Sequence, residues 1–355
     1  MRIINRYIGS RTARGWILVT CILVALFSVL ELVEQLNDVG EGSYRIQDAL
    51  LFVVYTLPGR TLQLLTPSIL LGGILALGNL DSGKELLAMR ASGFSPGHIA
   101  GSVLRVGIVV VIGAMLAAQF AVPALDQEAR LHRELALSKV GTLLPSVGFW
   151  TLDENRFIKV KTMLPGDILG NVEVYEFGNE NELKTFTRAE EAFIEPGGRW
   201  VLSNVTQSVW SDQGVSTQEF PRLNLDRLLT LRQVNVLALP PETLSLTDLV
   251  RFVGILEERG QSAERYRLVL WQKLTLPLSM VAMILLSVPF AIGKARQTGL
   301  GWRILLGSIL GIGYYFLAQA LGYLGLLMEL NPVFITVVPS LFILALAGFF
   351  WRKIG

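Results

Sequence analysis

The segment that comes closest to a catalytic motif is GNLDSGKE, at residues 78–85. It follows the phosphate-binding pattern GxxxxGK[ST] up to the last position, where Glu85 replaces the hydroxyl residue that would bind magnesium. It also follows an apolar stretch rather than a strand, so we expect no nucleotide site there. The same residues fit a capping box, with Ser82 as the N-cap and Glu85 at N3. We therefore predict a short helix over about 82–93, which Gly93 ends.

A second motif, GFSPG at residues 93–97, fits the GxSxG pattern of hydrolases and is followed by His98. A nucleophile elbow needs the backbone N–H after the serine for its oxyanion hole, and Pro96 has no N–H. The chain has two histidines and one cysteine, Cys21, so we expect neither a histidine-based metal site nor an internal disulfide. These residues predict a chain with no catalytic residues, no metal and no cofactor.

The composition places the chain in a membrane. Of its 355 residues 52% are hydrophobic and only 17% are charged, against about 25% in a typical soluble domain. The mean hydropathy is +0.50. The formal net charge of +2 gives no reason to expect a nucleic-acid partner.

Six windows without Asp, Glu, Lys or Arg are candidates for spanning helices, because a hydrocarbon core about 30 Å thick needs roughly 20 helical residues. They cover residues 15–30, 61–80, 106–125, 274–293, 304–328 and 330–351. Only helices can satisfy the backbone of single spans in lipid. An even number of spans places both termini on the same side.

The distribution of basic residues predicts which side that is. Twelve Lys and Arg residues flank the spans on the side of the termini, whereas the short opposite loop before the second span has only Arg45 and Arg60. The twelve are Arg2, Arg6, Arg11, Arg14, Lys84, Arg90, Arg105, Lys294, Arg296, Arg303, Arg352 and Lys353. By the positive-inside rule both termini are cytoplasmic, and no cleavage site follows the first span, which we interpret as an uncleaved anchor.

A large insertion separates the third span from the fourth and lies on the far side. Residues 126–139 have an amphipathic pattern that continues the third helix, and residues 141–241 alternate with period two between turn signals, which predicts an antiparallel β domain of sandwich or jelly-roll type. An amphipathic helix follows over about 245–260. We therefore divide the chain into residues 1–140 with three spans, the β domain over 141–241, a connecting helix over 242–273, and residues 274–355 with three more spans.

Several segments together resemble one known family, the lipopolysaccharide export permeases LptF/LptG, and most of all its LptG branch. These are NRYIG, EQLNDVGEGSY, ELLAMRASGF, and LPLSM and VPFAIG followed by GWRILLG, together with the layout of three spans, an inserted domain and three spans. The resemblance implies a subunit of an ABC transporter in the Gram-negative inner membrane that extracts lipopolysaccharide. It implies a homologous partner LptF, an ATPase dimer LptB, and a periplasmic jelly roll that passes the lipid to the jelly rolls of LptC and LptA.

The resemblance also assigns roles to residues. In the family a short cytoplasmic helix docks in a groove of the ATPase, and here that role falls on Glu85, Leu86, Met89, Arg90 and Phe94. Arg130 and Arg133 lie three apart on one helix face and suit lipid phosphates as charged donors, or they form a solvated face paired with nearby acids. The chain departs from the family pattern at the outer end of the first span, where Glu31, Asn37 and Asp38 stand where relatives can place lysines.

Two other functions fit the same layout. One is a permease subunit for another lipid or for lipoproteins. The other is a periplasmic binding or scaffold protein that the six helices anchor in the membrane.

Overall fold

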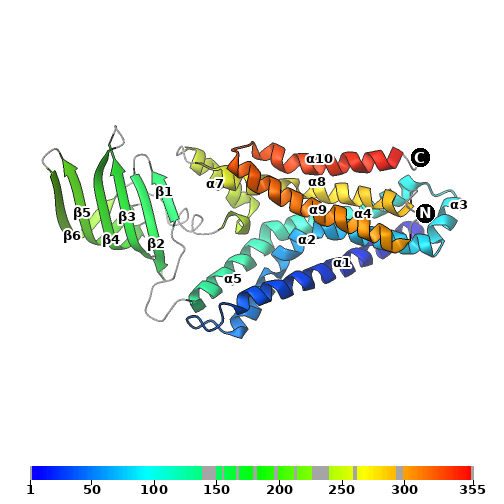
Figure 1. Cartoon of the computed structure of the whole chain (residues 1–355), viewed down its shortest axis with the longest axis horizontal. Helices are drawn as coiled ribbons and strands as arrows, with labels where there is room; N and C mark the ends of the chain where they lie inside the picture. Colours follow the sequence, from blue (N-terminus) through cyan, green and yellow to red (C-terminus); the bar gives the residue numbers. More distant parts are fainter. Residues whose placement is uncertain are drawn as a thin grey trace.

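The computed structural model describes residues 2–137, 149–153, 156–164, 168–178, 182–195, 199–211, 214–225, 240–258, 262–292 and 299–352. It has the shape of an elongated bundle of helices with a β-sheet beyond one end (Figure 1). Both chain termini lie at the opposite end of the bundle, beside the short helix α3. The expected basic residues Lys294, Arg296 and Lys353 are outside the described residues.

Six helices of the described residues are long and apolar enough to cross a membrane, which confirms the predicted number of spans. They are α1 (Arg2–Leu36), α2 (Ile46–Ser82), the continuous run Pro96–Leu137, α8 (Glu264–Ile292), α9 (Leu300–Leu327) and α10 (Pro332–Arg352). Most are longer than the uncharged windows because turns that bear charged residues remain helical outside the apolar segment. Thus α8 begins at Glu264, ten residues before the start that the sequence predicts.

The third span contains a local change of helical pitch. It is built from α4 (Pro96–Leu116), a π-helical turn η1 (Ala117–Ala121) and α5 (Val122–Leu137), so the predicted amphipathic continuation of this helix is confirmed. The side chain of Gln119 in η1 donates to Thr247 Oγ1 at 2.9 Å and accepts from the Leu246 backbone N–H at 3.1 Å. It thereby holds the start of the connecting helix α7 (Leu246–Glu258), whose existence the amphipathic pattern predicts.

Helices α2 and α8 form the centre of the bundle, and α1 and α9 both pack against α2. The contact of α1 with α2 depends on two glycines. A Cβ at Gly72 would lie 2.6 Å from the carbonyl oxygen of Gly15, and a Cβ at Gly15 would lie 2.5 Å from the carbonyl oxygen of Gly72. Only glycine allows two backbones to approach this closely, as is common where helices cross in membranes.

The inserted domain is an antiparallel sheet, as predicted. Its strands are β1 (Phe149–Asp153), β2 (Arg156–Leu164), β3 (Ile168–Phe177), β4 (Leu183–Glu195), β5 (Arg199–Ser211) and β6 (Gly214–Leu225), each paired with the next in the chain. Residues 141–148 and 226–239 of the expected domain are outside the described residues. The strand order is therefore consecutive across the described part of the domain.

A row of irregular positions bends this sheet. Asn171 in β3 and Asn204 in β5 have φ of +51° and +52°, and Asn204 Nδ2 donates to Glu190 Oε2 of the intervening strand β4 at 2.7 Å. Asparagine tolerates this left-handed conformation better than most residues. The buried side chains on either side of the row are three positions apart instead of two, in the pairs Leu169/Val172, Ala189/Ala192 and Leu202/Val205.

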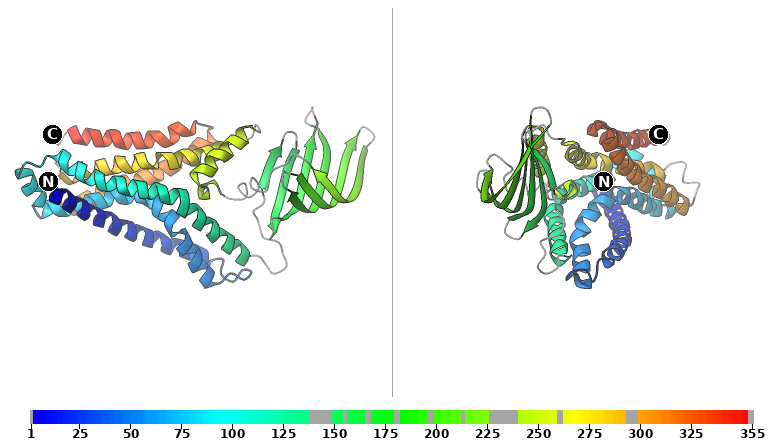
Figure 2. Two further views of the ribbon diagram at one scale, coloured as in Figure 1. Left: turned by 180° about the vertical axis from the view of Figure 1, so that it is seen from behind. Right: turned by 60° about the vertical axis from the view of Figure 1, so that its left-hand side comes forward.

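The sheet has an apolar face on which large side chains are buried. Trp200 is 0% exposed and packs with buried residues from β2 to β5. Figure 2 shows the resulting strong curvature in its right-hand view. The domain thus has an apolar interior, as the expected jelly roll would, and the curved sheet contributes its wall.

The turn between α2 and α3 (Glu85–Ala91) differs from the predicted capping box. Ser82 is the last residue of α2, and its hydroxyl donates to the Gly78 carbonyl at 2.9 Å. Lys84 takes a left-handed conformation with φ +59° and precedes α3 without a side-chain cap. The expected roles of Ser82 and Glu85 in a capping box are therefore wrong, because α2 extends through the N-cap position. Residues 78–82 of the Walker-like segment form the last turn of α2, where carbonyls rather than amides are unpaired, which is unsuitable for phosphate.

The predicted end of the short helix is confirmed. Gly93 has φ +95°, and the N–H groups of Gly93 and Phe94 donate to the carbonyls of Arg90 and Met89 at 3.1 and 3.0 Å. These two bonds form a complete Schellman motif. Ser95 of the GxSxG sequence is the N-cap of α4, where its side chain accepts from the backbone N–H of His98 and contacts the His98 ring at 2.9 Å.

We predict that Gly72→Leu prevents the close packing of α1 on α2. Overpacking costs about 1–3 kcal/mol in ordinary cores, and contact with a backbone carbonyl leaves less room to relax. The matched control is Gly113→Leu, because a Cβ at Gly113 meets nothing within 4 Å. Thermal unfolding of the purified chain in detergent should show a lower midpoint for Gly72→Leu only. Equal midpoints for both variants would contradict the proposed role of the glycine contact.

Candidate functional site

The short helix α3 is anchored in the bundle by its apolar residues. Leu86 is 1% exposed and belongs to the main core, and Met89 packs against that core. Leu86 is thus buried within the bundle, whereas Met89 is half-buried, and the expected docking role of both residues stays a prediction. Arg90 and Leu87 are exposed, and Phe94 is half-buried beside the His98 ring.

Glu85 is bound to the first helix of the chain. The hydroxyl of Tyr7 in α1 donates to Glu85 Oε2 at 2.8 Å, and Arg11 Nε donates to the Tyr7 oxygen at 3.2 Å. The guanidinium of Arg11 also lies 5.2 Å from the centre of the Tyr7 ring. Sequence reasoning missed Tyr7, although it belongs to the NRYIG segment. The structure thus connects the candidate coupling helix directly to α1.

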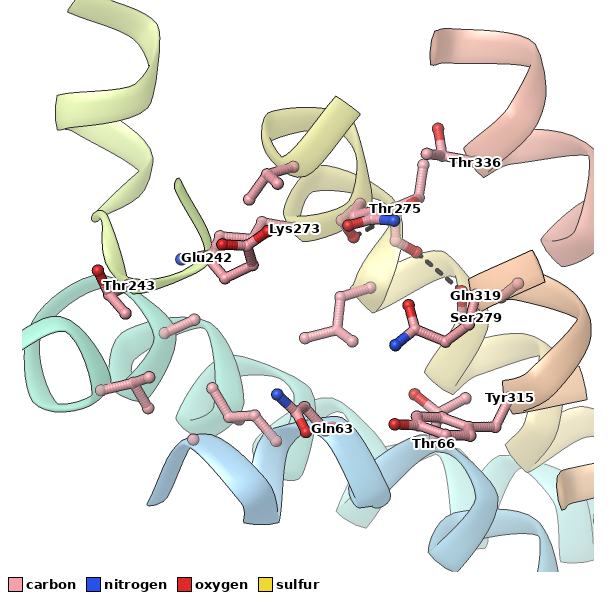
Figure 3. A pocket seen from close by; sticks show the side chains of 18 of the residues that line it. Gln63, Thr66, Glu242, Thr243, Lys273, Thr275, Ser279, Tyr315, Gln319 and Thr336 are labelled. Carbon is pink, nitrogen blue, oxygen red and sulfur yellow. Dashed lines mark hydrogen bonds between the residues drawn. The ribbon is translucent and has the colours of Figure 1, made fainter. Parts of the chain in front are cut away.

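A cavity of about 330 Å³ lies between helices α2, α5, α8, α9 and α10. Polar side chains of three helices turn toward it, as Figure 3 shows for Gln63 of α2, Ser279 of α8 and Gln319 of α9. Other polar residues in its wall are Thr66, Gln272, Lys273, Thr275, Tyr314, Tyr315, Thr336, Glu242 and Thr243. Polar groups are costly in a membrane and usually face a cavity or a partner there. This cavity is therefore the strongest candidate for a ligand-contacting site in the described part of the bundle.

Charged groups of α5 line the cavity as well. Asp126 lies against Gly59 of α2, where a Cβ would be only 2.9 Å from Asp126 Oδ2, so glycine makes the space for this carboxylate. Arg130 lies one turn farther along α5 and also lines the cavity. Among the described residues neither Asp126 nor Arg130 forms an ion pair within 4 Å. Arg130 and Lys273 nevertheless lie near enough to Asp126 to interact with its carboxylate electrostatically, so the wall of the cavity holds charges of both signs.

Arg133 has a different environment from Arg130, although both are on α5. Its guanidinium bonds Asp38 Oδ2 at 2.5 Å and Gln35 Oε1 at 3.0 Å. Gln35 also accepts from the hydroxyl of the buried Tyr44 at 3.1 Å. Burial raises the pKa of the Tyr44 phenol, so Tyr44 remains protonated and able to donate. Arg133 thus fixes the outer end of α1, and the expected pairing of the two arginines with acids of their own helix is not what the structure shows for Arg133.

Two of the acidic residues near the outer end of α1, Glu31 and Asp38, form ion pairs within the chain. Arg60 of α2 lies 3.2 Å from Glu31 and donates to Ser28 at 3.0 Å, while Asp38 pairs with Arg133. These acids therefore do not present unbalanced negative charge to an approaching phosphate. The sequence shows the acids but not their partners, because the partners are on other helices.

Comparisons with known proteins cover nearly the whole chain. The family model described as lipopolysaccharide export system permease LptF/LptG matches residues 6–353. The chain is 30% identical over 340 residues to the lipopolysaccharide export system permease protein LptG of Haemophilus influenzae, covering 95% of each protein. It is 31% identical over 347 residues to the protein of the same name from Escherichia coli K12, covering 95% of this chain and 94% of that protein.

We predict that Tyr7→Phe loosens α3, because it removes only the hydroxyl that donates to Glu85. A hydrogen bond to a charged group contributes about 1.5–3 kcal/mol, so amide exchange in residues 85–92 should accelerate by roughly tenfold or more. The control is Tyr323→Phe, because Tyr323 is exposed on α9. Hydrogen–deuterium exchange by mass spectrometry measures the effect. Unchanged protection of residues 85–92 in Tyr7→Phe would show that this bond does not hold α3.

Proposed function

Because the chain belongs to the LptF/LptG family of lipopolysaccharide export permeases, we propose that it is a transmembrane subunit of an ABC transporter for lipopolysaccharide. It extracts this lipid from the inner membrane and passes it to a periplasmic bridge toward the outer membrane. The observation that carries the proposal is the similarity to LptG proteins over 94–95% of both lengths, which spans the helices and the β domain alike. An anchored scaffold would not need the membrane half to match as well.

The chain is a multi-pass protein of the inner membrane, and its orientation is part of the proposal. Both termini and α3 face the cytoplasm, and the β domain faces the periplasm. The excess of Lys and Arg at the end of the bundle that holds the termini supports this orientation. The exposed apolar faces of α1 and α9 support assembly with a second permease subunit, for which the family implies LptF.

The energetics of lipid extraction explain why the proposed cargo needs a covered path. Exposing an acyl chain to water costs about 0.8 kcal/mol per CH₂, or on the order of 10 kcal/mol for a chain of about twelve methylenes. Lipopolysaccharide carries several such chains, so it requires apolar surface throughout. The exposed apolar faces of α1 and α9 and the apolar interior of the curled sheet are the candidate surfaces. LptC and LptA, whose jelly rolls the family implies, would receive the lipid next.

The energy source is a partner. The residues that resemble a phosphate loop lie at the end of a helix, so the chain depends on a separate ATPase, for which the family implies LptB. We assign contact with that ATPase to Glu85 and the exposed Arg90 of α3, together with Phe94. Leu86 and Met89 transmit the contact into the core. The bond from Tyr7 to Glu85 provides a route to α1.

The phosphorylated head group of lipopolysaccharide requires a polar site. Among the residues that line the cavity, Arg130 is the best candidate to bind it. Its guanidinium can bind a lipid phosphate with charge-assisted hydrogen bonds, since it has no ion-pair partner among the described residues. Arg133 would contribute only if a ligand displaced Asp38. We therefore rank Arg130 above Arg133 as a phosphate ligand.

We predict that Arg130→Gln reduces photo-crosslinking of lipopolysaccharide near the cavity, by about tenfold if one buried charged hydrogen bond is lost. The assembly of the transporter should remain normal. Arg133→Gln should instead release the outer end of α1 and lower the thermal unfolding midpoint. If both variants weaken lipid capture equally without a change in stability, the different roles assigned to the two arginines are incorrect.

We further predict that depletion of this chain in its host leaves newly made lipopolysaccharide in the inner-membrane fraction. Pulse labelling and separation of the two membranes measures its distribution. Restoration by the wild-type gene is the control. Normal arrival of lipopolysaccharide at the outer membrane, together with retention of another lipid or of lipoproteins, would favour the alternative permease function.

A further inference from the structure

Three helix ends meet at one arginine on the side of the bundle that holds α3. Arg303 is in the first turn of α9, Asp81 is the penultimate residue of α2, and Ala291 is the penultimate residue of α8. Arg303 Nη1 lies 3.2 Å from Asp81 Oδ2 and donates to the Ala291 carbonyl at 3.0 Å. The two side chains are only 5% and 8% exposed.

The contact with Ala291 serves α8. The last four carbonyls of a helix have no partner within the helix, and Ala291 is among them. A cation is also favoured at a helix C-terminus. Arg303 therefore acts as the C-terminal cap of α8 from a different helix.

The pair Asp81–Arg303 is oriented against the dipoles of its own helices. A carboxylate is unfavourable at the C-terminus of α2, and a guanidinium is unfavourable at the N-terminus of α9. Each charge is thus stabilised mainly by groups of other helices. Because of this pair, a displacement of the end of α2 changes the environment of the charge on α9, and a displacement of α9 changes that of the charge on α2.

The pair lies directly at the base of α3. The Asp81 carbonyl accepts from the Lys84 N–H at 2.9 Å in the turn that leads into Glu85. A displacement of α3 therefore moves the backbone of Asp81. Through Arg303 this displacement reaches the start of α9 and the end of α8.

We propose that Asp81 and Arg303 form a mechanical clasp that couples movement of α3 to α8 and α9. They are positioning residues, and the inference rests on the proposed function in that α3 receives the ATPase. The clasp forces the inner end of α9 to move with α3. The Tyr7–Glu85 bond connects α3 to α1 in a similar way. A movement of α3 is therefore transmitted to both α1 and α9.

The first test measures coupling in the complete transporter with its ATPase, in proteoliposomes. Asp81→Asn and Arg303→Gln should lower the lipid released per ATP hydrolysed about fivefold or more, the small end of typical coupling between sites. The conservative variant Arg303→Lys keeps a cation and a donor at this position and should lose less than half as much as Arg303→Gln. The control is Arg267→Gln, which removes the exposed ion pair with Glu257 and should leave the ratio unchanged.

The second test does not depend on the cargo. Spin labels at Leu87→Cys on α3 and Trp302→Cys on α9, both exposed positions, report the distance between the helices with and without nucleotide. Cys21→Ser gives a background without other cysteines. Without further substitutions, the distance between the two labels should be the same with and without nucleotide. In Asp81→Asn the distribution of this distance should broaden or shift when nucleotide binds.

These readouts separate the two proposals. An unchanged ratio of lipid to ATP in Asp81→Asn and Arg303→Gln, or a loss in Arg303→Lys as large as in Arg303→Gln, overturns the clasp. Unchanged spin-label distances in Asp81→Asn also overturn it. Absence of lipopolysaccharide release by the wild-type transporter would overturn the proposed function, and the spin-label distances would still decide whether the clasp exists.

Discussion

The hydrocarbon of a bilayer offers no hydrogen-bond partner, and this constraint governs most polar contacts in the bundle. Hydroxyls such as those of Thr12 and Ser68 donate to the carbonyl four residues earlier, at 2.9 and 2.7 Å. Trp16 Nε1 crosses to the carbonyl of Ile69 at 2.9 Å, and Trp351 Nε1 crosses to that of Leu285 at 3.0 Å. Neighbouring helices are thereby fixed to one another at polar points within an apolar core.

Several charged groups near the ends of the bundle are paired within the chain. Ion pairs at the outer end neutralise Glu31 and Asp38, and a buried pair at the inner end joins α2 to α9. Asp126 and Arg130 at the cavity have no ion-pair partner among the described residues. Of the two, the guanidinium of Arg130 has the charge that an anionic group needs, which agrees with the transport of an anionic lipid.

The sequence predicts the large elements well, because long uncharged windows and alternating strands are local patterns. It predicts the inserted β domain, the amphipathic extension to Leu137, the connecting helix and the glycine that ends α3. It does not predict the π-helical turn at residues 117–121, since hydrophobic periodicity does not distinguish a hydrogen bond between residues five apart from the usual α-helical bond between residues four apart. The capping box at Ser82 failed because α2 continues through it, and the left-handed Lys84 supplies the turn that a cap would have made.

The candidate site was less accessible to sequence reasoning because its contacts join distant positions. Tyr7 and Glu85 are 78 residues apart, Arg133 and Asp38 are 95 apart, and Arg303 and Asp81 are 222 apart.

The central claim, that the chain carries lipopolysaccharide through the interior of its β domain, can be tested by ATP-dependent photo-crosslinking at neighbouring positions of β6. Leu223 packs against the apolar interior, whereas Arg222 is exposed. A photoreactive residue at 223 should capture lipopolysaccharide only when ATP is hydrolysed, and one at 222 should not. Equal capture at both positions, or none at 223 during ATP hydrolysis, would contradict the claim.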